Sequence, residues 1–298
     1  MPRQANTRSS RGSQPPIVTE VASGIVSESP KYANAEAPHP QLPVAARIRL
    51  RYAKRGRMRF TSHRDFGRAL ERAVRRAGIP VAYSSGFNPH PRISYLGASP
   101  TGAASEAEYA EIALTESMPP EDVRRALDAA LPDGIDVVDA VVAGPQALAD
   151  RIEASVWQIT LSDIPVASAT AAVDAFLARD EVEVSRMTKK GLRTFDCRAA
   201  VIRAEVRLAD DEGPGEPCAI LELVLRHGTP SVRPDDVLAG LGDVGGLHPQ
   251  VPPLLNRVVQ GPLDAQSGTV GDPFAPDRDT SAVPRDGHVD RGGEMDVD

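Results

Sequence analysis

The sequence has very little cysteine and no long apolar run. Its two cysteines, Cys197 and Cys218, are too few for a disulfide framework and do not have the spacing of metal ligands. Nowhere does an apolar run reach the roughly 18 residues of a membrane-spanning helix. The N-terminal segment also lacks the apolar stretch of a signal peptide. These features favour a protein of a reducing compartment, and we expect it in the cytoplasm.

Aromatic residues are scarce as well, at 4% of the chain against 41% for all apolar residues. Aliphatic side chains must therefore provide most of the packing, and this apolar share is sufficient for real hydrophobic cores. A chain of 298 residues is long enough for about two domains of ordinary size.

Charge is distributed unevenly along the chain. The formal net charge is −7, yet residues 47–76 hold twelve Arg or Lys against Asp65 and Glu71, which gives +10 for that stretch. The remaining residues must then sum to −17, because −7 minus +10 is −17. This uneven distribution is more informative than the net charge, because the basic stretch alone could bind an anionic partner.

Both ends of the chain are predicted to be disordered. Residues 1–43 contain prolines, serines and scattered charges without sustained periodicity. Residues 261–298 form an acidic tail with nine Asp or Glu against three Arg. This tail could fold back on the basic stretch and compete with an anionic ligand, although such tails more often confer only solubility.

The first half of the remaining chain, residues 44–148, predicts the order strand, helix, two strands, helix, strand. Apolar residues alternate with arginines at 47–52 and again at 57–60, either as a hairpin around Gly56 or as one strand bent there. Ser62 and Asp65 then form a helix cap. The other predicted elements are a helix to residue 77, strands at 81–83 and 107–114, a helix at 120–130 and a strand at 135–142.

The second half, residues 149–260, repeats this order more loosely. Its predicted elements are strands at 156–161, 181–186, 201–208, 218–226 and 254–259, with helices at 167–177 and 234–241. Trp157 is expected in the core, and Lys189-Lys190-Gly191 at a solvated hairpin tip, with extension of an RNA track as the alternative. We therefore predict an α+β protein of two tandem ferredoxin-like (βαββαβ) units.

The first predicted helix carries arginine along one side. Four of these residues recur at spacings of four, four and three, opposite an apolar stripe: Arg64, Arg68, Arg72 and Arg75. Like charges at this spacing are mildly unfavourable by themselves. One interpretation is a solvated face neutralised by acids from elsewhere, and the other is a binding site for a polyanion. Arginine suits phosphate and bases, and the lack of a DNA-binding motif favours RNA.

A proline-stiffened loop follows, with the sequence Ser-Gly-Phe-Asn-Pro-His-Pro-Arg-Ile over residues 85–93. Pro89 and Pro91 would hold three side chains in fixed directions. These are Phe87 for stacking on a base, His90 for hydrogen bonding or proton transfer, and Arg92 for phosphate. A purely structural loop is the alternative interpretation.

Several of these segments resemble one family. They are Ser62-His63-Arg64-Asp65, the helix from Arg68 to Ala73, the loop from Gly86 to Ile93, and Glu106-Ala107-Glu108-Tyr109. Together they resemble the radical-SAM-linked domain of unknown function DUF 2344, and residues 189–191 and 232–235 resemble its second half. The likeness covers roughly residues 46–260.

The resemblance implies a partner and no established activity. Members are often fused to, or encoded beside, a radical-SAM enzyme, which binds an iron–sulfur cluster through a close trio of cysteines. This chain has two cysteines 21 positions apart, so it cannot supply that cluster. We therefore expect no cofactor or metal of its own, and a role as the partner that binds the substrate.

Our leading hypothesis is a non-catalytic RNA-binding subunit that presents tRNA or rRNA to a radical-SAM enzyme. The candidate contacts are Arg57, Arg59, Arg64, Arg68, Arg72, Arg75, Phe87, Asn88, His90 and Arg92. An alternative is metal-free RNA cleavage with His63 and His90 as general base and acid. A second alternative is a protein-docking adaptor. A metal site of His63, Asp65 and His90 is disfavoured, since His63 and Asp65 diverge at a helix start.

Overall fold

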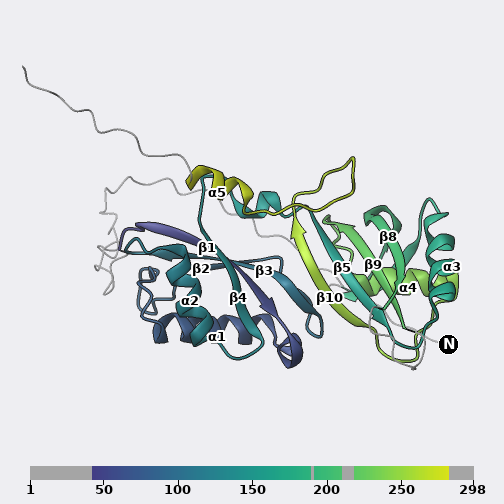
Figure 1. Ribbon diagram of the computed structural model, residues 1–298, viewed down its shortest axis with the longest axis horizontal. Coiled ribbons are helices and arrows are strands. Elements are labelled where there is room, and N and C mark those ends of the chain that lie inside the picture. Colours follow the sequence, from purple (N-terminus) through teal and green to yellow (C-terminus); the bar gives the residue numbers. More distant parts are fainter. Residues whose placement is uncertain (1–41, 189–190, 210–217, 282–298) are drawn as a thin grey trace, which may run out of the picture.

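The computed structural model describes residues 42–188, 191–209 and 218–281. Within them the chain is a mixed α+β protein with one large, mostly antiparallel sheet and several helices (Figure 1), so the predicted α+β class is confirmed. The predicted disordered leader lies outside the described residues except for its last two positions. None of the described helices has the length and apolar character needed to cross a membrane.

The first half places two helices on one side of four strands. The elements in chain order are β1 (Ala46–Lys54), η1 (Gly56–Phe60), α1 (His63–Arg76), β2 (Ile93–Leu96), β3 (Ala104–Leu114), α2 (Pro120–Ala130) and β4 (Ile135–Val142). β1 lies between β3 and β4, and β2 pairs with the other edge of β3, always antiparallel. Buried side chains of β1, β3 and β4 pack against α1 and α2 in one apolar core.

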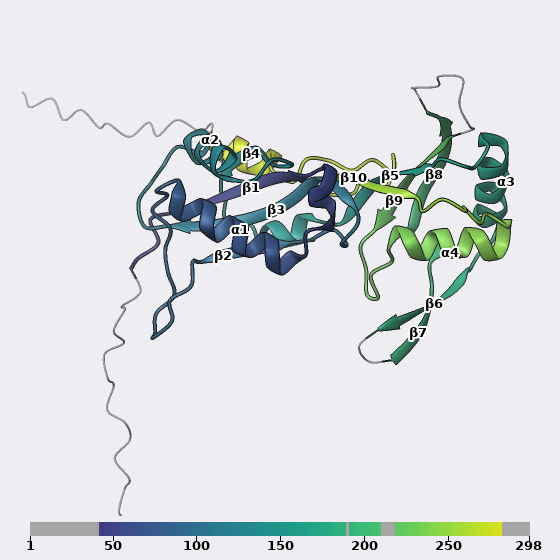
Figure 2. The ribbon, with the colours of Figure 1, turned by 90° about the horizontal axis from the view of Figure 1, so that it is seen from below.

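The second half repeats this arrangement after η2 (Leu148–Arg151). Its main elements are β5 (Ala154–Leu161), α3 (Val166–Leu177), β8 (Val201–Leu208), β9 (Ala219–Arg226), α4 (Pro234–Gly245) and β10 (Leu254–Gly261). The strand order is β10-β5-β9-β8, and α3 and α4 enclose a second core that includes Trp157 as predicted. The hairpin of β6 (Glu183–Thr188) and β7 (Gly191–Asp196) stands apart from the sheet (Figure 2). The short helix η3 (Arg198–Ala200) precedes β8.

The two halves meet where β10 lies parallel to β3. The pairing is short, with Asn256 opposite Ala104 and Arg257 opposite Ser105. The contact is reinforced by the hydroxyl of Tyr109, which donates to the carbonyl of Gln260 at 3.1 Å. The strands of both halves therefore form one continuous sheet (Figure 1).

The alternating run at residues 57–60 is not a strand, so the predicted hairpin, or bent strand, is wrong. Residues Gly56–Phe60 form the 3-10 helix η1 instead. β1 is already paired with β3 on one edge and β4 on the other, which leaves no free edge for a hairpin partner. Likewise, Val81 and Tyr83 make only isolated bridges, and the unpredicted β2 occupies the edge of β3.

The predicted disordered tail begins too early. Gly261 is the last residue of β10, Leu263 bridges to Val270, and Ala275–Ser281 form α5. The side chain of Phe274 is fully buried and contacts Tyr109 edge-on. Because the segment is mostly acidic, its composition gave no sign that Phe274 would be buried. Residues 282–298 of the predicted tail lie outside the described residues.

Candidate nucleic-acid interface

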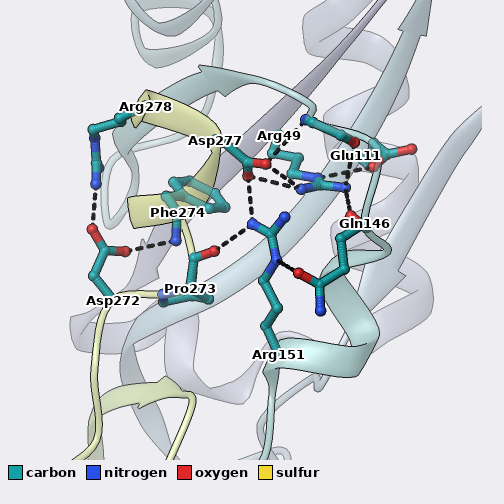
Figure 3. A network of polar contacts seen from close by, with 10 residues as sticks. Arg49, Glu111, Gln146, Arg151, Asp272, Pro273, Phe274, Asp277 and Arg278 are labelled. Atoms are coloured by element: carbon teal, nitrogen blue, oxygen red, sulfur yellow. Dashed lines mark hydrogen bonds and ion pairs between the residues drawn. The ribbon is translucent and has the colours of Figure 1, made fainter. Parts of the chain in front are cut away.

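The arginines of β1 do not form an exposed basic face. Arg49 is buried on the side of the sheet opposite α1, and its guanidinium donates to both carboxylate oxygens of Asp277 at 2.7 Å (Figure 3). It also donates to Glu111 at 3.1 Å and to the carbonyl of Gln146 at 2.6 Å. Arg151 joins the same carboxylate at 3.0 Å. The acidic tail therefore does fold back on the basic stretch, but as part of the core.

Other arginines of this stretch are also paired with acids from distant segments. Arg47 reaches Glu111 at 3.1 Å, and Arg51 lies 3.9 Å from Asp139. Arg55 binds Glu106 and, at 2.8 Å, Asp136. The hydrogen bond to Glu106 is the main cause of the raised pKa of Arg55. Acids from elsewhere in the chain therefore neutralise these arginines, which contribute little free positive charge to a binding surface.

Helix α1 presents its arginines to solvent, as its periodicity predicts. Ser62 caps the helix by accepting a hydrogen bond from the Asp65 amide, and the buried residues of the helix are Phe66, Leu70, Ala73 and Val74. Arg64, Arg68, Arg72 and Arg75 are all exposed on the other side. We call these four residues the α1 arginine row.

The α1 arginine row is only weakly neutralised. Arg68 lies 3.9 Å from Asp65, and Arg75 lies 3.8 Å from Glu71, in both cases within the same exposed helix. Such pairs are worth at most about 0.5 kcal/mol. Among the described residues, no acidic side chain forms an ion pair with Arg64 or Arg72. A row of this kind can exchange its weak intrahelical pairs for phosphate oxygens.

Two more candidate arginines lie on η1, just before α1. Arg57 is exposed, and the guanidinium of Arg59 stacks over the ring of Phe60 at 4.7 Å. Phe60 is 59% exposed, whereas the predicted strand would put it on one face with the apolar residues of 47–52. An exposed aromatic ring beside arginine is a combination that stacks well on nucleic-acid bases. This feature was missed because the local structure is helical and not extended.

The loop at residues 84–92 has a fixed base and an exposed tip. The amide of Ser84 donates to the carbonyl of His90 at 2.9 Å, and the amide of His90 donates to the Ser84 hydroxyl at 3.1 Å. Arg92, half-buried, donates its amide to Ala82 at 2.8 Å. At the tip, Phe87 is 82% exposed and Asn88 is also exposed. The ring is therefore accessible to a stacking partner, although single exposed apolar residues are common on protein surfaces.

The two candidate catalytic histidines are not brought together by any direct contact. His63 and His90 are both exposed, and the ring of His63 packs edge-on against Tyr95 at 5.1 Å. Within the described ranges, no hydrogen bond or ring contact joins the two histidines. The same ranges contain no group of three metal-ligating side chains. Asp65 instead accepts a hydrogen bond from the Ser62 hydroxyl at 2.7 Å.

The fold and this surface define an α+β protein with a weakly neutralised basic helix and a rigid, aromatic-tipped loop. Residues 47–234 match the model of a family described as "Uncharacterized protein conserved in bacteria (DUF2344)", so the chain belongs to that family, as its motifs predict. No curated protein matches the chain. A crystal structure of an unknown protein from Galdieria sulphuraria matches at 13% identity, over 72% of this chain and 99% of that chain. Its TM-score is 0.20, too low to support an argument about the fold.

Proposed function

We propose that this protein is a non-catalytic RNA-binding subunit whose main contact surface is the α1 arginine row. The observation that carries the proposal is the difference between the two sets of arginines. Those of β1 are neutralised by distant acids, whereas the α1 arginine row and Arg57 of η1 remain exposed, with weak ion-pair partners or none among the described residues. Exposed arginines with unsatisfied donors match phosphate oxygens in charge and geometry.

Two further features support RNA as the polyanion. Phe60 and Phe87 are exposed rings on η1 and on the loop, and each is suited to stack on an unpaired base. The candidate contacts are therefore Arg57, Arg59, Phe60, the α1 arginine row, Phe87, Asn88, His90 and Arg92. A membrane surface would not need rings held on a rigid loop beside a charged helix.

We also propose that each half is a ferredoxin-like unit. Two separate sections of the sheet, β4-β1-β3-β2 and β10-β5-β9-β8, share one strand order relative to the chain. Each has two helices in the corresponding places. In this interpretation the β6–β7 hairpin is an insertion in the second unit. Sheets of this type are common platforms for RNA.

The proposed partner is a radical-SAM enzyme on another chain, as family resemblance suggests. Support from this chain is the absence of a metal-ligating cluster among residues 42–188, 191–209 and 218–281, together with a total of two cysteines. The chemistry would then belong to the partner, and this chain would hold the RNA.

The direct test is equilibrium binding of fluorescent total tRNA to the wild type and to the triple variant Arg68→Glu, Arg72→Glu, Arg75→Glu. A matched control reverses three exposed arginines elsewhere, Arg125, Arg179 and Arg226, and so changes the net charge equally. We expect the α1 variant to bind at least about tenfold more weakly, and the control to stay within about twofold.

Equal affinities for the wild type and the α1 variant would contradict an RNA site on α1. In that case the row would be a protein-docking surface. A complex with a protein partner that survives nuclease treatment and is lost in the α1 variant would identify it as such.

A further inference from the structure

A polar cavity of about 520 Å³ lies where the two halves meet. It is lined by the 98–101 loop of the first half, by β5 and β10, and by the segment leading into α4. A volume of this size accommodates a nucleotide-sized molecule. None of its lining residues belongs to the α1 arginine row, so the cavity is a separate feature of the surface.

One wall of the cavity holds a buried charge cluster. Arg257 lines the cavity, and its guanidinium binds Glu108 and donates to the hydroxyl of Ser105 at 3.3 Å. Both ionic side chains are at most 5% exposed. Burial alone would raise the pKa of Glu108, but Arg257, Ser105 and the amide of Ser99 outweigh it and lower that pKa. These partners therefore favour the ionised form of the carboxylate.

Lys54 adds a second buried cation behind this pair. It is 5% exposed, its ammonium group lies 3.4 Å from the carbonyl of Pro100, and burial lowers its pKa. Two cations, Arg257 and Lys54, therefore face one anion, Glu108. The cluster carries an excess of positive charge that an anion in the cavity would offset.

The adjacent strand β5 adds an oriented chain of hydrogen bonds beside Arg257, whose guanidinium lies over the ring of its strand partner Trp157 at 5.5 Å. The Nδ1 atom of His227 lies 3.0 Å from the carbonyl of Ile152, which accepts its proton, so Nε2 is the acceptor from the Ser155 hydroxyl at 3.1 Å. The indole of Trp157 donates to the same Ser155 oxygen at 2.9 Å. These groups satisfy one another, which leaves the arginines as the donors available to a ligand.

The mouth of the cavity carries further donors. Arg233 is exposed there, and within the part of the chain that the structure describes it forms no ion pair within 4.0 Å. Thr101 contributes a hydroxyl from the opposite loop. Asp235 is the acid of the lining, and burial is the main cause of its raised pKa. The lining therefore carries two arginines against one carboxylate that is costly to ionise.

We propose that this cavity binds the phosphate group of a nucleotide-sized ligand between Arg257 and Arg233. Arg257 supplies a buried guanidinium already held in place by Glu108, and Arg233 closes on the ligand from the mouth. The ligand is either a free nucleotide or the terminal nucleotide of an RNA. The second source is within reach of the basic surface, because the amide of Gly102, beside Thr101, donates to the carbonyl of Arg59 at 2.8 Å.

The chain offers a built-in reporter, because Trp157 is its one tryptophan and lines the cavity. Inorganic phosphate is titrated into the full chain at constant ionic strength, with chloride as the matched salt, and Trp157 fluorescence and binding heat are recorded. We expect a saturable response in the wild type. Arg233→Gln should weaken the apparent affinity at least about tenfold, and Arg233→Lys should recover part of it. Arg226→Gln, an exposed arginine outside this cavity, should not change it.

The proposal would be overturned if the wild type gave no binding heat and no fluorescence change. It would also be overturned if Arg233→Gln responded to phosphate as strongly as the wild type. Because Arg257→Gln alone would leave Glu108 buried without its partner, that pair is tested as Glu108→Gln with Arg257→Gln. The double variant, once shown to be folded by its unfolding transition, should lose the response. Its full retention would also overturn the proposal.

The source of the phosphate is distinguished with three probes: adenosine monophosphate, and one short oligoribonucleotide with either a 5′-phosphate or a 5′-hydroxyl. Tight binding of the monophosphate indicates a free nucleotide. Tighter binding of the phosphorylated oligonucleotide than of both others indicates an RNA end. The α1 triple variant should keep the response to inorganic phosphate, and Arg233→Gln should keep its affinity for the oligonucleotide with a 5′-hydroxyl. These two controls separate a failure of the cavity proposal from a failure of the proposed RNA site on α1.

Discussion

Asp277 illustrates how much a single residue of an apparently disordered tail can contribute. Its carboxylate is fully buried and bridges Arg49 and Arg151, from β1 and η2. It also accepts a hydrogen bond from the amide of Gly144 at 3.0 Å. Removing one member of a buried ionic group leaves the others desolvated and uncompensated, which is far more costly than losing an exposed pair.

We therefore predict that Asp277→Asn lowers the free energy of unfolding by roughly 3–5 kcal/mol. The measurement is chemical denaturation of the full chain. The matched control is Asp279→Asn, two residues further along in the same helix, which is exposed and should shift stability by no more than about 0.5 kcal/mol. Similar stabilities for the two variants would show that the fold does not depend on the fold-back of α5.

Glu108 makes stability depend on pH in a predictable direction. Its pKa is lower in the folded protein than the ordinary value of 4.5, so its ionised form stabilises the fold. That contribution is complete above the unfolded-state pKa and is lost as the pH falls through the folded-state pKa. The stability difference between wild type and Glu108→Gln should be largest near neutral pH and shrink below about pH 4.5. Denaturation at several pH values measures it, and a constant difference would contradict the assignment.

Phe87 should matter for binding and not for folding. Because its ring is 82% exposed, Phe87→Ala should leave the unfolding transition unchanged within about 0.5 kcal/mol. If the ring stacks on a base, the same change should weaken binding of single-stranded RNA by about 1–3 kcal/mol. Denaturation and equilibrium binding on the same samples separate the two effects. A loss of stability without a loss of affinity would make the loop structural.

At the scale of elements, helix α1 shows what local sequence determines. Ser62 caps the helix through the Asp65 amide at 3.2 Å, and the apolar stripe fixes which side is buried. Ser62→Ala should destabilise the protein by about 1 kcal/mol, because an N-terminal amide loses its acceptor. Ser85→Ala, at an exposed loop position, is the control and should have no measurable effect. Chemical denaturation of both variants tests this, and equal stabilities would show that the Ser62 cap does not stabilise the protein.

Elements with strong local signals were predicted with correct bounds. The helix Pro120–Ala130 begins at a proline, and the strands Ile135–Val142 and Val201–Leu208 are rich in β-branched residues. The errors arose where pairing with distant strands determines whether a segment forms a strand. Residues 57–60 alternate like a strand but find no free sheet edge, whereas β2 forms because β3 has one. Lys189 and Lys190, predicted at a hairpin tip, lie outside the described residues.

The sites were predictable to different extents for the same reason. Periodicity alone places the α1 arginine row opposite the buried stripe, and the structure finds all four residues exposed. The cavity could not be predicted, because its groups are distant in the chain. Glu108 and Arg257 are 149 positions apart and come together only through the pairing of β3 with β10. Glu108 lies in one of the segments that resemble the family, but nothing in the local sequence of either residue indicates that the two form an ion pair.

At the scale of the whole molecule, the two sides of the sheet in the first half differ in charge. Figure 1 shows α1 and α2 on one side of the sheet and α5 on the other. On the α5 side, the buried Asp277 and the partly exposed Glu111 neutralise arginines of β1. On the α1 side, arginine remains exposed. A net charge of −7 therefore coexists with one strongly basic surface, and the rest of the acidic molecule should disfavour nonspecific attachment of RNA elsewhere.

The central claim is that the α1 arginine row contacts phosphate, and the salt dependence of RNA affinity tests it most directly. Each phosphate contact contributes about 0.7–0.9 to the slope of log affinity against log salt concentration. We predict that reversing Arg68, Arg72 and Arg75 reduces the magnitude of that slope for tRNA by about 2–3, while reversing Arg125, Arg179 and Arg226 leaves it unchanged. Equal slopes for the wild type and the α1 variant would contradict the account, whatever their absolute affinities.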